Sequence, residues 1–222
     1  MNAKILKFAE AHPVGFLKYP RKLAAPLRAV KKFIAPAEVQ SRGLCTRTED
    51  QGSTSQCAAY SATQFAESIN WSNKHYWDEI DPAKIYARAK ETDGDPDDDG
   101  TTLNDALEAI LYYKYIDPTD CKVVNVNYNN LKFALHSYGR IVGGFNITED
   151  WYAPKQGVIS TTTGGSLGGH AVFVVGYNRD GIFIQNSWGE SWGKNGFALV
   201  SWDVVKKQYI YGAVIKGCLK PE

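Results

Sequence analysis

Three apolar runs near the C-terminal end, separated by glycines, constrain the fold of this chain most strongly. Residues 171–177, 181–185 and 196–202 are rich in branched and aromatic side chains, which is typical of buried strands. We expect them to form an antiparallel meander. In that arrangement the start of the first strand and the end of the second are neighbours. His170 and Asn186 occupy those two ends, so we expect their side chains to meet in space.

A second constraint is a cysteine at the expected start of a helix. Residues 51–55 are mostly turn and cap residues, whereas residues 56–70 have apolar positions spaced three and four apart. Cys57 therefore lies on the first turn of a helix. There the free N–H groups and the positive end of the helix dipole favour a thiolate over a thiol. The side-chain amide of Gln51, six residues upstream, is expected beside the sulfur.

These residues together form a nucleophile, a base and an orienting group. An Asn oxygen that accepts a hydrogen bond from one imidazole nitrogen leaves the other nitrogen facing the thiol. A lone cysteine is more often a small buried hydrophobic residue, and we interpret Cys45, Cys121 and Cys218 in that way. Disulfides between Cys45 and Cys121, or between Cys121 and Cys218, remain as alternatives.

The order and local sequence of these residues resemble those of the papain family of cysteine peptidases. The resemblance rests on Gln51 followed by Cys57, on residues 169–172 with a later Gly-Tyr turn, and on the block 186–189 followed by Trp192-Gly193 and Asn195-Gly196. It covers the chain from about residue 36 to residue 216. The fold that it implies is α+β, with a helical half, an antiparallel β-barrel-like half and the active-site cleft between them.

The same resemblance implies the roles of the site residues. Cys57 would be the nucleophile, His170 the general acid and base, and Asn186 the residue that orients His170, with Gln51 in the oxyanion hole. Gly100, Thr101, Gly169 and Trp188 would bind the substrate, which is a peptide or protein. The implied activity is endopeptidase hydrolysis through an acyl-thioester, with no cofactor and no metal ion. Alternatives are an acyltransferase or amidase with the same triad, and an inactive papain-like scaffold used for binding.

Charge divides the chain into a basic extension and an acidic body. Residues 1–35 contain eight Lys or Arg residues and one acidic residue, which leaves 17 basic and 23 acidic residues in 36–222. We interpret 1–35 either as a flexible arm or as a propeptide-like segment that docks on the acidic body and covers the cleft. Nucleic acid is not expected as a partner, because the body is acidic and the arm has no base-reading module.

An acidic loop lies just before the middle of the chain, with five aspartates among residues 93–99. Asp95, Asp97 and Asp99 before Gly100 resemble the start of a calcium loop, but Ala106 stands where the final acidic ligand is needed. We therefore expect a solvated loop rather than a metal site. Its charge would favour basic substrates or receive the basic arm.

Further elements are indicated by caps and periodicity. Asp81-Pro82 predicts a helix through residue 89 with Ile85 and Tyr86 inward, and Thr102 caps another helix. Residues 129–138 are expected to be helical and 141–147 to form a strand, while Ile5, Phe8 and Ala9 share one face of a short helix. The sequence shows neither a secretory signal nor a membrane-spanning run. This favours a cytoplasmic location, with leaderless export as the alternative.

Overall fold

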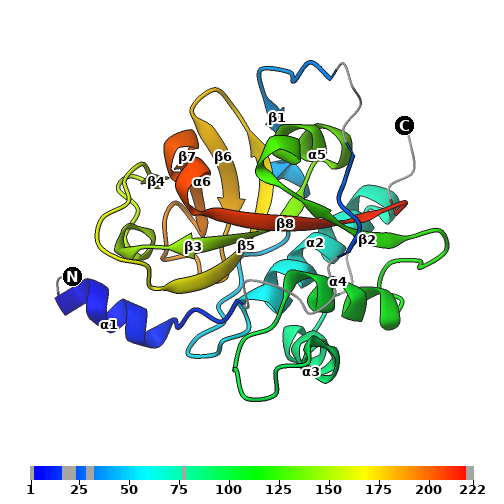
Figure 1. The fold of residues 1–222 in the computed structure, drawn as a ribbon, viewed down its shortest axis with the longest axis horizontal. Coiled ribbons are helices and arrows are strands. Elements are labelled where there is room, and N and C mark those ends of the chain that lie inside the picture. The colour runs from blue at the N-terminus through cyan, green and yellow to red at the C-terminus, as the bar shows by residue number, and fades with distance from the viewer. Residues whose placement is uncertain (1–2, 17–23, 29–32, 77–78, 219–222) are drawn as a thin grey trace.

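The computed structural model describes residues 3–16, 24–28, 33–76 and 79–218, and its helices and strands gather in two halves (Figure 1). The helical half contains α2 (Cys57–Lys74), α3 (Pro82–Asp93) and α4 (Leu103–Tyr112). The other half is an eight-stranded sheet. The expected α+β class is therefore confirmed. In the part of the chain that the model describes, no helix has the length and apolar character needed to cross a membrane.

The sheet is antiparallel except at one end. Its strand order is β2-β8-β3-β5-β6-β7-β4, and β1 pairs with β5 outside this path. Only β4 and β7 run parallel among the paired strands. The neighbours β5, β6 and β7 form the expected meander. The strands are β1 (Val39–Gln40), β2 (Lys122–Val126), β3 (Ile141–Ile147), β4 (Val158–Ile159), β5 (Gly168–Tyr177), β6 (Gly181–Gln185), β7 (Phe197–Ser201) and β8 (Tyr209–Lys216).

The helices begin where the capping residues predict. The Asp81 carboxylate accepts a hydrogen bond from the Ala83 N–H at the start of α3, and Thr102 caps α4 through the Asp105 N–H. Tyr86 is only half-buried, because its hydroxyl reaches the Asp99 carbonyl at the surface. The remaining helices are α1 (Ala3–Ala11), α5 (Leu131–Tyr138) and α6 (Trp202–Gln208), with 3-10 turns η1 (Arg42–Leu44), η2 (Tyr128–Asn130) and η3 (Glu149–Tyr152).

The main core lies where α2 packs against β5. Phe65 of α2 meets Phe173 of β5 edge-to-face, with ring centroids 6.5 Å apart. Both side chains are fully buried. Because α2 begins with Cys57 and β5 begins two residues before His170, this packing brings the start of the helix to the start of the strand.

The acidic loop after α3 wraps around a lysine. Lys90 Nζ donates to the carbonyl oxygens of Asp95, Asp98 and Gly100 at 2.6, 2.7 and 3.0 Å. It also lies 2.8 Å from the buried carboxylate of Asp93. The Lys90 ammonium group therefore binds backbone carbonyl oxygens of this loop. Residues 95–99 are exposed, as expected for a solvated loop, while Lys90 holds the backbone of the loop from within.

We predict that Lys90→Met lowers the free energy of unfolding by about 3 kcal/mol, because it leaves the Asp93 carboxylate buried without a counter-charge. Chemical denaturation of both proteins would measure the difference. Lys206→Met, at an exposed position of α6, is the matched control and should stay near wild type. Equal losses for the two variants would mean that the Lys90 ammonium does not hold the loop.

Candidate active site

Cys57 sits at the first turn of α2, in contact with β5. Its sulfur accepts a hydrogen bond from the Ala171 N–H at 3.4 Å, and the Gly15 backbone lies beside the sulfur, where it favours the thiolate. The side chain is fully buried. The helix start predicted from the spacing is therefore present, and it faces the strand that carries His170.

His170 and Asn186 meet as the meander requires. His170 Nε2 lies 2.8 Å from Asn186 Oδ1, and because an amide oxygen only accepts, Nε2 is the donor. The Ser187 N–H donates to the same oxygen at 2.9 Å, which fixes the orientation of the amide. Among the described residues His170 Nδ1 has no hydrogen-bond partner although it is buried. It is the nitrogen left available for the thiol.

Gln51 is held by its neighbours in one orientation. Ser187 Oγ donates to Gln51 Oε1 at 2.7 Å, and Gln51 Nε2 donates to the carbonyl oxygens of Thr54 and Pro13 at 2.6 and 3.2 Å. The Gln51 backbone N–H is bonded to the Ser187 carbonyl at 2.8 Å. Sequence reasoning placed Gln51 near the sulfur but missed Ser187, for which the only signal was its position in the 186–189 block.

Trp188 covers the His170–Asn186 pair. Its ring stacks on the imidazole of His170 with centroids 4.3 Å apart and planes 25° from parallel. Tyr152 stacks on its other side at 5.0 Å. Trp188 is fully buried, so the hydrogen bond beneath it is shielded from water.

The chain's own N-terminal segment, defined as residues 3–16 and 24–28, passes over these residues. The Phe16 N–H donates to the Gly169 carbonyl, and the Thr101 N–H donates to the Gly15 carbonyl, both at 3.0 Å. Phe16 and Thr101 form an isolated parallel bridge. The expected substrate-binding positions Thr101 and Gly169 are therefore occupied by backbone of the same chain.

The N-terminal segment lies close to the body of the protein because glycines stand at two of the contact positions. A Cβ on Gly100 would lie 2.1 Å from the Gly15 carbonyl oxygen, and one on Gly169 would lie 2.3 Å from the Phe16 carbonyl oxygen. The Phe16 ring occupies a pocket beside Gly144 and Tyr211, with 5.6 Å between the two aromatic centroids. Gly100 thus makes room for the segment, as does Gly169.

Helix α1 continues this contact across Trp188. Phe8 meets Trp188 edge-to-face at 5.9 Å and stacks on His12 at 4.2 Å. His12 Nε2 lies 3.1 Å from an Asp50 carboxylate oxygen. Ile5, Phe8 and Ala9 pack against the core, in agreement with the expected apolar face.

Burial shifts the pKa values of Cys57 and His170 in this arrangement. Burial raises the pKa of the Cys57 thiol above its ordinary 9.0, despite the hydrogen bonds from Ala171, Gly15 and the helix start. Burial also lowers the pKa of His170 to about 4, against the opposing effect of Asn186. The expected preference for a thiolate is therefore reversed here, because desolvation outweighs the helix N-terminus.

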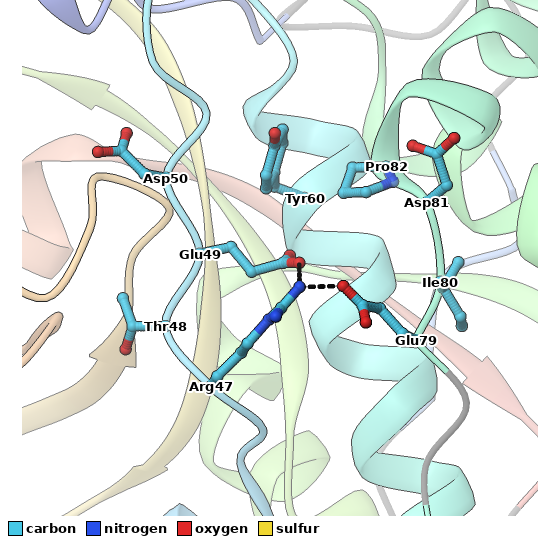
Figure 2. Close-up of a pocket in the computed structure, with 9 residues that line it drawn as sticks. All are labelled: Arg47, Thr48, Glu49, Asp50, Tyr60, Glu79, Ile80, Asp81 and Pro82. Atoms are coloured by element: carbon cyan, nitrogen blue, oxygen red, sulfur yellow. Dashed lines mark hydrogen bonds and ion pairs between the residues drawn. The ribbon is translucent and has the colours of Figure 1, made fainter.

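A separate pocket lies beside the strand-like loop that leads to Gln51. It has a volume of about 740 Å³ and is lined by Arg47, Thr48, Glu49, Asp50, Tyr60, Glu79, Ile80, Asp81 and Pro82. Figure 2 shows the Arg47 guanidinium between the carboxyl groups of Glu49 and Glu79, and the distance to Glu49 is 3.8 Å. Burial, reinforced by Glu67, raises the pKa of Glu49 to about 7. Nothing in the sequence pattern indicated this cluster.

The other cysteines do not join the site. Cys45, Cys121 and Cys218 are free thiols, so neither alternative disulfide is present. Cys121 and Cys218 line one pocket at the far end of the sheet. Burial raises the pKa of Cys45 and of Cys218 to about 12.

Comparison with known proteins identifies the family. Residues 89–215, more than half of the chain, match the family described as papain family cysteine protease. The chain belongs to the papain family. The matched region contains His170 and Asn186 but begins after Cys57. The placement of Cys57 in the site therefore rests on the contact between α2 and β5.

Individual relatives match over shorter regions or at lower identity. A gut-specific cysteine proteinase of Caenorhabditis elegans is 33% identical over 75 residues, which is 32% of this chain and 23% of that protein. Pro-cathepsin H of Medicago truncatula is 28% identical over 204 residues, covering 76% of this chain and 57% of the relative. The aligned part thus spans about a quarter of the first relative and little more than half of the second.

Solved structures support the papain-like fold. Xylellain, a cysteine protease from Xylella fastidiosa, superposes with a TM-score of 0.72 at 18% identity, covering 93% of this chain and 96% of that one. Digestive procathepsin L 3 of the Tenebrio molitor larval midgut gives 0.71 at 18% identity, with 96% and 78% covered. The expected division into a helical half and a β half is therefore confirmed.

We predict that alkylation of Cys57 in the full chain is slow near pH 7 and accelerates only above pH 9.0, because a raised thiol pKa leaves little thiolate at lower pH. Mass spectrometry after timed exposure to iodoacetamide would give the rate. The same chain unfolded in guanidinium is the control, and its Cys57 should react at the pH of an ordinary thiol. Fast labelling of the folded chain near pH 5 would contradict the prediction.

Proposed function

We propose that this protein is a cysteine endopeptidase whose cleft is closed by its own N-terminal segment. One observation carries the proposal most directly. The Pro13 carbonyl accepts a hydrogen bond from Gln51 Nε2, while the Gly15 backbone lies beside the Cys57 sulfur. A peptide backbone therefore lies beside the Cys–His–Asn group with a carbonyl oxygen at the amide donor. A backbone carbonyl at this amide donor supports the proposal that the carbonyl oxygen of a peptide substrate is bound in the same place.

The proposed reaction has two halves. Cys57 Sγ attacks the scissile carbonyl carbon, a C–S bond forms, and the oxyanion is stabilised by Gln51 Nε2 and the Cys57 N–H. The thiol proton passes to His170 and then to the leaving amine as the C–N bond breaks. His170 next takes a proton from water, which attacks the thioester. The C–S bond breaks, the thiol is restored and a carboxylic acid leaves.

Asn186 and Trp188 act on His170 rather than on the substrate in this proposal. The Asn186 oxygen holds the proton on Nε2, which turns Nδ1 toward the thiol. The stacked Trp188 ring keeps water from that hydrogen bond. Gly100, Thr101 and Gly169 bind the substrate backbone in place of residues 15 and 16.

The basic extension of residues 1–35 acts as a propeptide-like inhibitor, and 36–222 as the peptidase domain. Its described contacts include backbone hydrogen bonds, aromatic packing, the buried Leu27 side chain, and a contact between the His12 ring and the Asp50 carboxylate. Most of its lysines and arginines, including Lys18, Arg21 and Lys22, fall outside the described residues. The structural neighbours of the whole chain include a procathepsin. This likeness supports the proposal that residues 1–35 bind the peptidase domain of the same chain.

The function is tested by a substitution that displaces the segment. A Cβ on Gly15 would lie 2.2 Å from the Ser55 carbonyl oxygen, whereas a Cβ on Gly43 meets nothing within 4 Å. We predict that Gly15→Ala raises the rate of hydrolysis of a denatured protein substrate well above that of the wild type. Gly43→Ala is the matched control and should behave as wild type.

Other outcomes separate the alternatives. Activity that disappears in Gly15→Ala combined with Cys57→Ala would assign the reaction to Cys57. Products that carry an added amine, formed in preference to free acids, would favour the acyltransferase. A Gly15→Ala chain that labels rapidly at Cys57 but cleaves nothing would identify a binding scaffold.

The oxyanion role of Gln51 gives a separate prediction. In the Gly15→Ala background, Gln51→Ala should lower kcat by roughly a hundredfold or more, as loss of one oxyanion donor usually does. Gln56→Ala is the control, because the Gln56 side chain makes no capping hydrogen bond at the start of α2. Equal activity of the two variants would show that Gln51 does not stabilise the oxyanion.

A further inference from the structure

The N-terminal segment has a second contact far from the cysteine, on the edge strand of the sheet. Strand β2 ends the strand order, and its inner side pairs with β8 in the register Asn125↔Ala213. On its outer side, Pro26 and Asn125 form a parallel bridge. Residues 24–28 therefore pair alongside the edge strand β2. This contact lies outside the active-site cleft.

The backbone geometry of this contact is that of strand addition. The Leu27 N–H donates to the Asn125 carbonyl at 2.8 Å, and the Asn125 N–H donates to the Ala25 carbonyl at 3.0 Å. Both hydrogen-bonding groups of Asn125 are thereby satisfied. Pro26, between the two bonded residues, has no N–H, so the outer side of the added strand offers no donor at that position.

Side-chain contacts make the site selective for one position of the segment. Leu27 is buried with 6% of its surface exposed and joins the hydrophobic core, whereas Ala25, Pro26 and Arg28 are exposed. Asn130 Nδ2, just before α5, donates to the Leu27 carbonyl at 2.7 Å. An extended chain is thus recognised by three hydrogen bonds to its backbone and one apolar side chain.

The body holds this site in shape independently of the segment. The side chains of Asn104 and Asn125 form a pair of amide hydrogen bonds at 2.9 and 3.2 Å, which ties β2 to α4. The Tyr209 hydroxyl donates to the Val126 carbonyl at 2.9 Å and ties β2 to β8. These contacts involve no residue of the segment, so the site persists when the segment leaves.

We propose that the edge of β2, with Asn130, is a second peptide-binding site that takes an extended chain with an aliphatic side chain at the Leu27 position. Its occupation by residues 24–28 keeps the cleft closed, because a segment held at one site stays at high effective concentration at the other. Once the segment is displaced, the site accepts extended peptides of the same chemistry. The inference that the occupied site keeps the cleft closed rests on the proposed inhibition by the N-terminal segment.

The first test measures the alkylation rate of Cys57 in the full chain. Leu27→Ala should accelerate labelling at least about tenfold, since truncation of a buried leucine costs more than the ~1.4 kcal/mol that equals a factor of ten. Ile34→Ala removes an aliphatic side chain that is 90% exposed on the same extension and should leave the rate unchanged. A Leu27→Ala rate equal to that of Ile34→Ala would overturn the control of the cleft by this site.

The Gly15→Ala chain separates this failure from failure of the proposed function. If Gly15→Ala accelerates labelling but Leu27→Ala does not, the segment closes the cleft without help from β2. If the wild type already labels as fast as Gly15→Ala, the segment does not protect Cys57 and the inhibitory role itself is wrong.

The second test asks whether the site binds a peptide in trans. In a Leu27→Asp full chain, whose own segment no longer fits, the capped peptide Ala-Ala-Pro-Leu-Arg should shift the amide NMR signals of Asn125 and the side-chain amide of Asn130. The peptide with Asp in place of Leu should shift neither. Absence of shifts with the leucine peptide at millimolar concentration, or equal shifts with both peptides, would overturn the site.

Discussion

Packing of the first turn of α2 against the start of β5 is the contact on which the site depends. It brings the Cys57 sulfur to the N–H of Ala171, the residue that follows His170 in sequence. The long-range contacts behind it, such as Phe65 on Phe173, are fully buried. Because the site residues come from both halves of the fold, their relative positions depend on the core that joins the halves. Here that core is made of side chains with few alternative positions.

The loop before α2 and the turn after β6 complete the arrangement from opposite sides. The backbone of Gln51 pairs with Ser187, and the Glu49 carbonyl accepts from the Gly189 N–H at 3.0 Å. These backbone hydrogen bonds fix the position of Gln51 relative to Asn186, although the two residues are 135 positions apart in the sequence. Because Ser187 bonds both to Gln51 and to Asn186, it couples the two amides through a single residue.

Local patterns predicted the elements better than their partners. The strand pattern of residues 170–202 and the helix start at Cys57 were readable because a glycine-bounded apolar run and a three-four spacing each have one ordinary explanation. The pairing of β2 with β8, and of residues 24–28 with β2, joins segments far apart in sequence, and no local signal encodes it. The sequence did not predict the role of Lys90 for a related reason. Lys90 binds backbone carbonyl oxygens of the loop, and a pattern of side chains does not show where these lie.

The pKa of the buried Cys57 thiol differs from expectation. The sequence shows that Cys57 lies at a helix N-terminus, but it does not show how much solvent surrounds the sulfur. A thiolate at a helix start is favoured only when water or a counter-charge shares the cost of the charge. With the segment in place Cys57 and His170 are both fully buried, and burial shifts the pKa of each toward its neutral form. The acidic pocket in Figure 2 reflects the same effect, since Glu49 also changes its pKa through burial.

A neutral, fully buried thiol at Cys57 has a consequence for the lifetime of the molecule. Peroxides and disulfides react with thiolates, and the first product of peroxide attack, a sulfenic acid, leads on to irreversible sulfinic and sulfonic acids. With the Gly15 backbone beside the sulfur and Trp188 over the histidine, the fully buried sulfur is closed to such reagents. Under the proposed function, the N-terminal segment would therefore keep Cys57 reduced as well as inactive until the segment is displaced.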